Sequence, residues 1–298
     1  MSMQDKIQEV EDILDKYLTA GKILSQVRGE AADKIRVGAK LLDVAEFVEQ
    51  RTVELGGKPA FPCNLSRNDE AAHATPTAGD TTVFGKDIVK LDMGVHVDGY
   101  IADAALTVDL SGNKDLADAS RQALEAAIDT VKGGVNTAEI GAVIEDTIRE
   151  KGFKPVANLT GHGLARYQAH TPPSIPNRHI GQGMELQAGD IIAIEPFATD
   201  GAGKISDGSF TEIYQFIQKK PIRMPAARKL LKELKEYSTL PFAKRWLTSP
   251  KIDLALMQLE KAEIITSFPV LKEVGGGMVS QAEHTLIVTE DGCEITTR

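Results

Sequence analysis

The chain has 298 residues, of which 34 are basic and 43 acidic, and its formal net charge is −9. This balance does not suit nucleic acid or an anionic membrane as the main partner, so we expect no DNA and no membrane contact. The start is charged from its first turn and no apolar run reaches the length of a membrane span, which predicts a cytoplasmic protein. Cys63 and Cys293 are too few for a disulfide framework and are expected to be free thiols.

Two helical patterns come first in the chain. Apolar residues recur at helical spacing from Asp5 to about Glu30 and again from Leu41 to Leu55, before Gly56-Gly57. Residues 59–80 are rich in Pro, Asn, Asp and Thr, which predicts a long loop with short extended pieces. His73 lies in this loop, where a lone histidine is more often structural than functional.

The stretch from Leu91 to Leu110 predicts a β-hairpin. Asp98-Gly99 between two apolar runs is a strong signal for a two-residue turn. With that turn, Asp103 lies opposite Gly94, and Asp92 points to the same face as Asp103. The two aspartates are then diagonal neighbours with Cα atoms about 7–8 Å apart.

The surroundings of these aspartates favour a metal site. An acidic pair in a hairpin is more often solvated surface, but Asp92 and Asp103 both sit among apolar residues. Two buried carboxylates this close ionise together only when cations compensate their charge. Their spacing suits a pair of cations about 3.5–4 Å apart, so further ligands are expected elsewhere in the chain.

Two helices are expected after the hairpin. The first runs from Asp115 to Lys132 and ends at Gly133-Gly134. Asn136 starts the second, with Glu139 as its capping-box partner, and this helix lasts to about residue 151. Two strands followed by two helices predict an α+β layer in which a sheet carries its helices on one side.

Residues 158–177 form a second informative stretch, which we expect to be a loop. Gly161 and Gly163 flank His162 and allow the backbone to approach a ligand closely. His170 precedes a Pro-Pro pair that stiffens the segment. Each histidine alone is compatible with an ordinary structural role, but three of the six histidines lie in Gly- and Pro-bounded segments.

Two glutamates sit next to buried strands. Residues 191–194 read as an apolar strand with Glu195 at its end, where Pro196 stops regular pairing. Near the C-terminus, a strand is expected to carry Glu283 and His284 ahead of a second hairpin turn at residues 291–292. A buried, unpaired carboxylate is costly, so a bound cation would explain both positions.

Residues 219–266, called the insert below, differ in composition from the rest of the chain. They are rich in Lys, Arg, Leu and Glu and predict helices at 226–237 and 252–264. Pro241 and Pro250 interrupt them. Their charges are most simply read as solvated faces, so we expect a small helical subdomain within one catalytic domain spanning residues 1–298.

The candidate ligands can now be assembled. They are four carboxylates and one imidazole: Asp92, Asp103, Glu195, Glu283 and His162. Four negative charges balance two divalent cations, and oxygen ligands with one histidine suit Mn, Fe, Co or Zn. The residues therefore predict a hydrolase in which two metals activate a water molecule.

The order of these residues resembles the ligand set of the pita-bread metallopeptidases. The local motifs AFP with AAHATP, LDMGVHVDGYIAD, RYQAHTPPSIPN, AIEPFAT and QAEHTLIV resemble the type 2 methionine aminopeptidases, in a short archaeal-like form. The resemblance covers nearly the whole chain. It implies an α+β fold with a curved antiparallel sheet, covered by helices, in two pseudo-twofold halves, and a helical insert typical of type 2.

The resemblance also implies roles for the site residues. Asp103 and Glu283 would bridge two metals, with Asp92 on one metal and His162 and Glu195 on the other. Glu195 would shuttle a proton. Outside the metals, His73 and His170 would position the peptide and stabilise its oxyanion, and Phe61 would line the methionine pocket.

The implied reaction is removal of the initiator methionine from nascent chains with a small second residue. A transient ribosome contact and a monomeric state are expected. Departures from the type 2 pattern, at Ala74, Thr160, Ala169 and Phe268, concern the pocket wall. Two alternatives share the fold, namely an Xaa-Pro aminopeptidase and a non-catalytic RNA- or protein-binding homologue.

Overall fold

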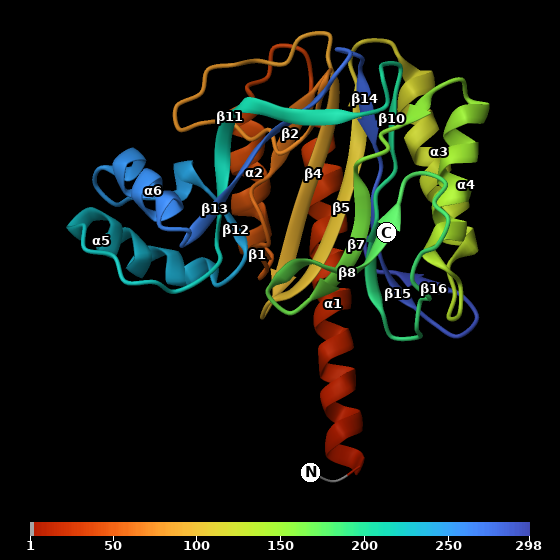
Figure 1. Ribbon diagram of the computed structural model, residues 1–298, viewed down its shortest axis with the longest axis horizontal. Helices are drawn as coiled ribbons and strands as arrows, with labels where there is room; N and C mark the ends of the chain where they lie inside the picture. The colour runs from red at the N-terminus through yellow and green to blue at the C-terminus, as the bar shows by residue number, and fades with distance from the viewer. Residues whose placement is uncertain (1–2) are drawn as a thin grey trace.

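The computed structural model describes residues 3–298, and its first half packs two helices on a group of antiparallel strands (Figure 1). The elements of this half are α1 (Met3–Ala32), α2 (Leu41–Glu54), β1 (Lys58–Pro59), β2 (Asn64–Arg67), β4 (Ile88–Val97) and β5 (Tyr100–Asp109). On β4, Leu91, Met93 and Val95 belong to the buried cluster formed with α1 and α2. Strand alternation therefore turns Asp92 and Gly94 to the opposite face.

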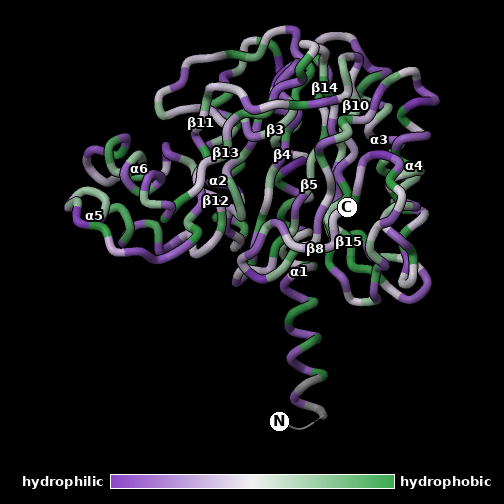
Figure 2. Tube along the Cα trace, viewed as in Figure 1, coloured by the Kyte–Doolittle hydropathy of each residue, from purple (hydrophilic) through white to green (hydrophobic). Residues whose placement is uncertain are grey.

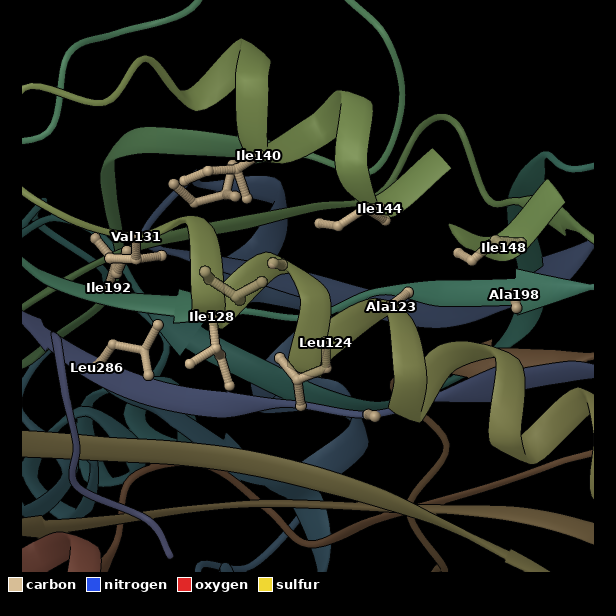
Figure 3. Packing of buried hydrophobic residues seen from close by; sticks show 14 of the residues in the cluster. Ala123, Leu124, Ile128, Val131, Ile140, Ile144, Ile148, Ile192, Ala198 and Leu286 are labelled. Atoms are coloured by element: carbon tan, nitrogen blue, oxygen red, sulfur yellow. The ribbon is translucent and has the colours of Figure 1, made fainter. Parts of the chain in front are cut away.

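The second half repeats this arrangement with another helix pair. It contains α3 (Lys114–Thr130), α4 (Thr137–Glu150), β6 (Lys154–Pro155), β7 (Thr160–Ala165), β8 (Gln168–Pro176), β9 (Ile191–Ile194), β10 (Phe197–Thr199), β14 (Val279–Gln281), β15 (His284–Val288) and β16 (Cys293–Ile295). Figure 3 shows Leu124 and Ile128 of α3 and Ile144 of α4 facing Ile192 and Leu286 of the sheet. Burial of these aliphatic side chains fixes both helices on the strands.

The two halves meet along the free edge of β5. The backbone of Ala105 exchanges two hydrogen bonds with Glu283, at N–O distances of 2.9 and 3.4 Å. The Thr107 hydroxyl donates to Gln281 O at 2.7 Å and accepts from Gln281 N at 2.9 Å. This seam extends the pairing of the first half into the second and brings residues far apart in sequence side by side.

A separate sheet, in the order β12-β11-β13-β3, carries the insert. Its strands are β3 (Glu70–Ala72), β11 (Ile205–Phe216), β12 (Pro241–Ala243) and β13 (Ile265–Glu273). The insert adds α5 (Pro225–Glu233), α6 (Ile252–Lys261) and the short 3₁₀ turns η1 (Leu234–Tyr237) and η2 (Lys244–Trp246). Leu230, Phe242 and Leu259 form a separate buried cluster there.

The start of α1 projects from the body, and its first turns include the exposed residues Ile7 and Val10 (Figure 1). Figure 2 shows hydrophobic and hydrophilic residues alternating along this part of the helix. Within residues 3–298, no helix is both long and apolar enough to cross a membrane.

Most local predictions are confirmed, and two are wrong. The capping box of Asn136 and Glu139 is present at the start of α4, and Cys63 and Cys293 are free. Residues 158–177, expected to be a loop, mostly form the β7–β8 hairpin, because the Gly and Pro residues sit at register shifts inside paired strands. Glu283 lies in a break between β14 and β15 rather than within one strand.

Candidate metal centre

The aspartates of the hairpin lie as the turn signal predicts. Asp103 pairs with Gly94 and Asp92 with Ala105, so the expected register is confirmed. Both carboxylates line one cavity. The two-residue turn therefore determines which face of the first half carries the acidic pair.

The second half supplies the other three candidates to the same cavity. His162 lies on β7, Glu195 directly follows β9, and Glu283 occupies the break before β15. Ligand atoms of Asp103, His162 and Glu283 all lie within 4.8 Å of one another. His162 Nε2 is 3.5 Å from Glu195 Oε1 and 3.8 Å from Asp103 Oδ2.

The seam between the halves holds Asp103 and Glu283 in place. Thr285 Oγ1 donates to Asp103 O and accepts from Asp103 N, with both distances 2.8 Å. Two residues further along β5, the backbone hydrogen bonds of Ala105 hold Glu283 against the same edge of this strand. Backbone pairing rather than side-chain flexibility therefore sets the separation of these two carboxylates.

The electrostatics of the site are those of crowded, desolvated acids. Burial raises the pKa of Asp92 to about 6. Burial first, and then repulsion from neighbouring carboxylates, raises the pKa values of Asp103, Glu195 and Glu283 well above the ordinary range. Burial lowers the pKa of His162 to about 3, with a smaller contribution from His170, so its imidazole is neutral. Carboxylates arranged in this way ionise together only beside compensating cations.

The donor set fits divalent metal ions. Asp92 Oδ1 and Asp103 Oδ1 are buried and have no hydrogen-bond partner within the described part of the chain. His162 Nδ1 donates to Gly163 O at 3.2 Å, so Nε2 keeps its lone pair for a ligand. At 3.5–3.8 Å, the contacts of Nε2 with carboxylate oxygens are too long for hydrogen bonds. Bound cations would satisfy these atoms.

Two further histidines border this cluster. The His170 ring centroid lies 4.3 Å from that of His162. His73 Nδ1 donates to Pro269 O at 3.3 Å, and burial lowers the pKa of His73 to about 4. Both line the cavity. His73 is therefore a neutral imidazole with a lone pair on Nε2.

The cavity has a volume of about 880 Å³. Phe61 forms part of its wall, and its ring lies against Gly94, where a Cβ atom would come within 2.3 Å of Phe61 Cε1. Among the positions that depart from the type 2 pattern, Thr160, Ala169 and Phe268 line the cavity, whereas Ala74 is buried and does not line it.

Two amide side chains at the site were not singled out by the sequence reasoning. Gln281 Nε2 donates to Asp92 Oδ2 at 3.4 Å and to Glu283 Oε2 at 3.3 Å. Asn64 is the cross-strand partner of Asp92, and its side chain opposes the rise in the pKa of that carboxyl. Gln281 stands two positions before Glu283, a spacing that could have suggested a shared face. The pairing of Asn64 with Asp92 has no comparable local signal.

Comparisons with known proteins agree with this chemistry. Residues 15–290 match metallopeptidase family M24. The chain belongs to this family. Among its M24 relatives, the methionine aminopeptidase of Archaeoglobus fulgidus is 52% identical over 290 residues, covering 97% of this chain and 99% of the relative. That of Methanocaldococcus jannaschii is 51% identical over 288 residues, covering 95% and 98%.

Solved structures of other proteins show the same fold. A thermophilic Arx1 superposes with a TM-score of 0.84 at 18% identity, covering 96% of this chain and 90% of that one. Methionine aminopeptidase from Thermotoga maritima gives 0.72 at 24% identity, covering 96% and 97%. The expected α+β pita-bread fold is confirmed. Membership in M24, together with the buried Asp, His and Glu cluster, means that the site works with divalent metal ions.

Proposed function

We propose that this chain is a methionine aminopeptidase that removes the initiator methionine from nascent proteins whose second residue is small. The observation that supports this most directly is the group of four buried or half-buried carboxylates and one neutral imidazole that lines a cavity of about 880 Å³. The curated relatives at 52% and 51% identity carry the same activity in their name, which favours it over the Xaa-Pro aminopeptidase and non-catalytic alternatives.

The metal complement proposed is two divalent ions per chain, drawn from Mn, Fe, Co and Zn. Asp103 and Glu283 would be shared by both ions, because the seam holds these two carboxylates together between the halves. Asp92 would bind one ion, and His162 and Glu195 would bind the other. Bound ions would lower the pKa of a water molecule and polarise the scissile carbonyl.

Glu195 is the proposed proton carrier. Burial and the charges of Asp103 and Asp92 raise the pKa of its carboxyl, so it can take a proton from the attacking water and return it to the leaving amine. Its carbonyl oxygen accepts from Asn177 Nδ2 at 3.1 Å, which fixes the backbone directly after β9.

His73, His170 and Phe61 are the proposed substrate contacts. The neutral His73 ring, with Nδ1 bonded to Pro269 O, leaves Nε2 to accept a hydrogen bond from the peptide. His170, exposed beside His162, would stabilise the developing oxyanion. Phe61, packed on Gly94, would contact the methionine side chain.

The organisation proposed is one catalytic domain over residues 1–298, with residues 219–266 as its insert subdomain. The separate buried cluster of the insert supports this division. A monomer acting in the cytoplasm, with a transient ribosome contact, is proposed because the substrate is a nascent chain.

Peptide hydrolysis tests the proposal. Protein loaded anaerobically with Mn, Fe or Co is incubated with Met-Ala-Ser and, separately, with Ala-Pro-Ala. Release of methionine from the first peptide, with the second left intact, is expected. Cleavage of Ala-Pro-Ala alone would favour the Xaa-Pro activity, and no cleavage of either by metal-loaded protein would refute a peptidase. Glu195→Gln should reduce methionine release by orders of magnitude, and wild-type turnover in this variant would exclude the proton-carrier role.

A further inference from the structure

A buried polar cluster joins the insert to the wall of the cavity. Arg245, on η2, forms an ion pair with Glu49 of α2, and the two side chains are only 4% and 13% exposed. Trp246 Nε1 donates to the other oxygen of Glu49 at 2.8 Å. Removing one partner of an ion pair this well buried destabilises the protein, because it leaves an uncompensated buried charge.

The same cluster bonds two segments that border the substrate cavity. Arg245 Nη1 donates to Thr75 Oγ1 at 2.7 Å and to Pro76 O at 3.1 Å. Cys63 N donates to Glu49 Oε1 at 3.3 Å, and Thr75 Oγ1 donates to Cys63 O at 2.7 Å. The segment that follows Phe61 and the segment that follows His73 are thus tied to each other and to the insert.

His73 itself has a backbone conformation that needs such support. Its φ is +62°, in the left-handed region that non-glycine residues adopt at a cost and that persists where surrounding contacts enforce it. Directly after it, Ala74 O accepts from Leu65 N at 2.7 Å. The next two residues, Thr75 and Pro76, are the ones that Arg245 contacts.

The strand that follows the insert contacts the imidazole itself. Pro269 O accepts the Nδ1 proton of His73, and the Phe268 ring meets the His73 ring edge-on with centroids 5.5 Å apart. Both residues lie on β13, the strand that returns from the insert. The backbone of His73 is therefore held from η2 and its ring from β13.

We propose that Arg245 is a positioning residue for His73: through Thr75 and Pro76 it keeps the His73 backbone left-handed and its imidazole aimed at the substrate. This inference rests on the proposed aminopeptidase function, in which His73 contacts the peptide. It assigns the insert a role in the reaction, because the insert supplies the side chain that sets the geometry of a substrate-contacting residue.

A double-mutant cycle tests the proposal. Arg245→Met should lower kcat/KM for Met-Ala-Ser by about 10-fold to 100-fold while metal affinity stays at the wild-type value, since Arg245 touches no metal ligand. In a His73→Ala background the same change should cost nothing more. An equal loss in both backgrounds would overturn the proposal. Lys244→Met is the matched control, because Lys244 lies on the same turn but pairs with Asp253 and Glu212 instead of with Glu49.

A second variant and a second readout keep the test decisive. Thr75→Val removes the hydroxyl between Arg245 and Cys63 but leaves the buried ion pair. It therefore replaces Arg245→Met in the double-mutant cycle if Arg245→Met does not fold. The ¹⁵N NMR signals of the His73 ring should move in Thr75→Val and not in Lys244→Met, and unchanged signals in Thr75→Val would also overturn the proposal. Absence of methionine release by the wild-type enzyme would contradict the proposed function, whereas the NMR result stands independently of it.

Discussion

The hydroxyl of Thr285 is the single group whose loss should most weaken the contact between the two halves at the metal centre. It donates to Asp103 O and accepts from Asp103 N, both at 2.8 Å, and Thr285 is fully buried. Thr285→Val keeps the shape of the side chain but leaves one buried donor and one buried acceptor unpaired. Each unpaired group costs about 1–3 kcal/mol, so the free energy of unfolding should fall by about 2–6 kcal/mol.

Urea unfolding of metal-free protein measures that loss, and calorimetric titration with Mn measures its effect on the site. Both stability and metal affinity should fall, because the backbone of Asp103 is no longer held on β15. Thr147→Val is the control: its hydroxyl donates only to Val143 O within α4, and we expect a loss below about 1 kcal/mol. A comparably small loss in Thr285→Val, with wild-type metal affinity, would refute the reasoning.

Three further predictions concern other parts of the molecule. Asp103→Asn should abolish binding of both metals and Asp92→Asn should mainly weaken one, as metal analysis of the two variants would show; equal losses would contradict this division. Gly94→Ala should raise KM for Met-Ala-Ser in steady-state assays, because the added Cβ displaces the Phe61 ring; an unchanged KM would exclude that contact. Glu273→Gln should destabilise the protein at pH 7 and progressively less towards pH 3 in urea titrations.

The sign of the Glu273 effect follows from its surroundings. Burial alone would raise the pKa of this carboxyl, but four backbone N–H groups, of Ala202, Gly203, Gly275 and Gly277, outweigh burial and lower it below 4.5. When the pKa of a carboxyl is lower in the folded chain than in the unfolded chain, the ionised carboxyl stabilises the fold at pH values above the unfolded pKa. This stability is lost as the pH falls through the folded pKa. A difference between wild type and variant that stays constant with pH would exclude this explanation.

Local signals in the sequence predicted the parts of the site that depend on neighbours in the chain. The Asp98-Gly99 turn and strand alternation were enough to bring Asp92 and Asp103 to one face, and the all-apolar run before Glu195 correctly marked a strand end. The metal-ligand candidates in the second half could be grouped with the hairpin only by their chemistry and by family resemblance.

Long-range pairing accounts for what sequence reasoning missed. The contact of Thr285 with Asp103 joins residues 182 positions apart, and no local pattern specifies its register. Residues 158–177 looked like a loop because Gly and Pro interrupt a local hairpin, whose first strand, β7, also pairs with β9 further along the chain. Arg245 belongs to the insert, whose charges were expected to be solvated, but it is buried against Glu49 of α2, a contact that becomes visible only in the folded chain.

Methionine release measured during a metal titration tests the central claim most directly. Metal-free protein is titrated anaerobically with Mn or Co, and bound metal and free methionine from Met-Ala-Ser are determined on the same samples. The proposed site predicts no release without metal and full activity when two ions are bound per chain. Two bound ions per chain without methionine release, or release that is independent of metal, would contradict it.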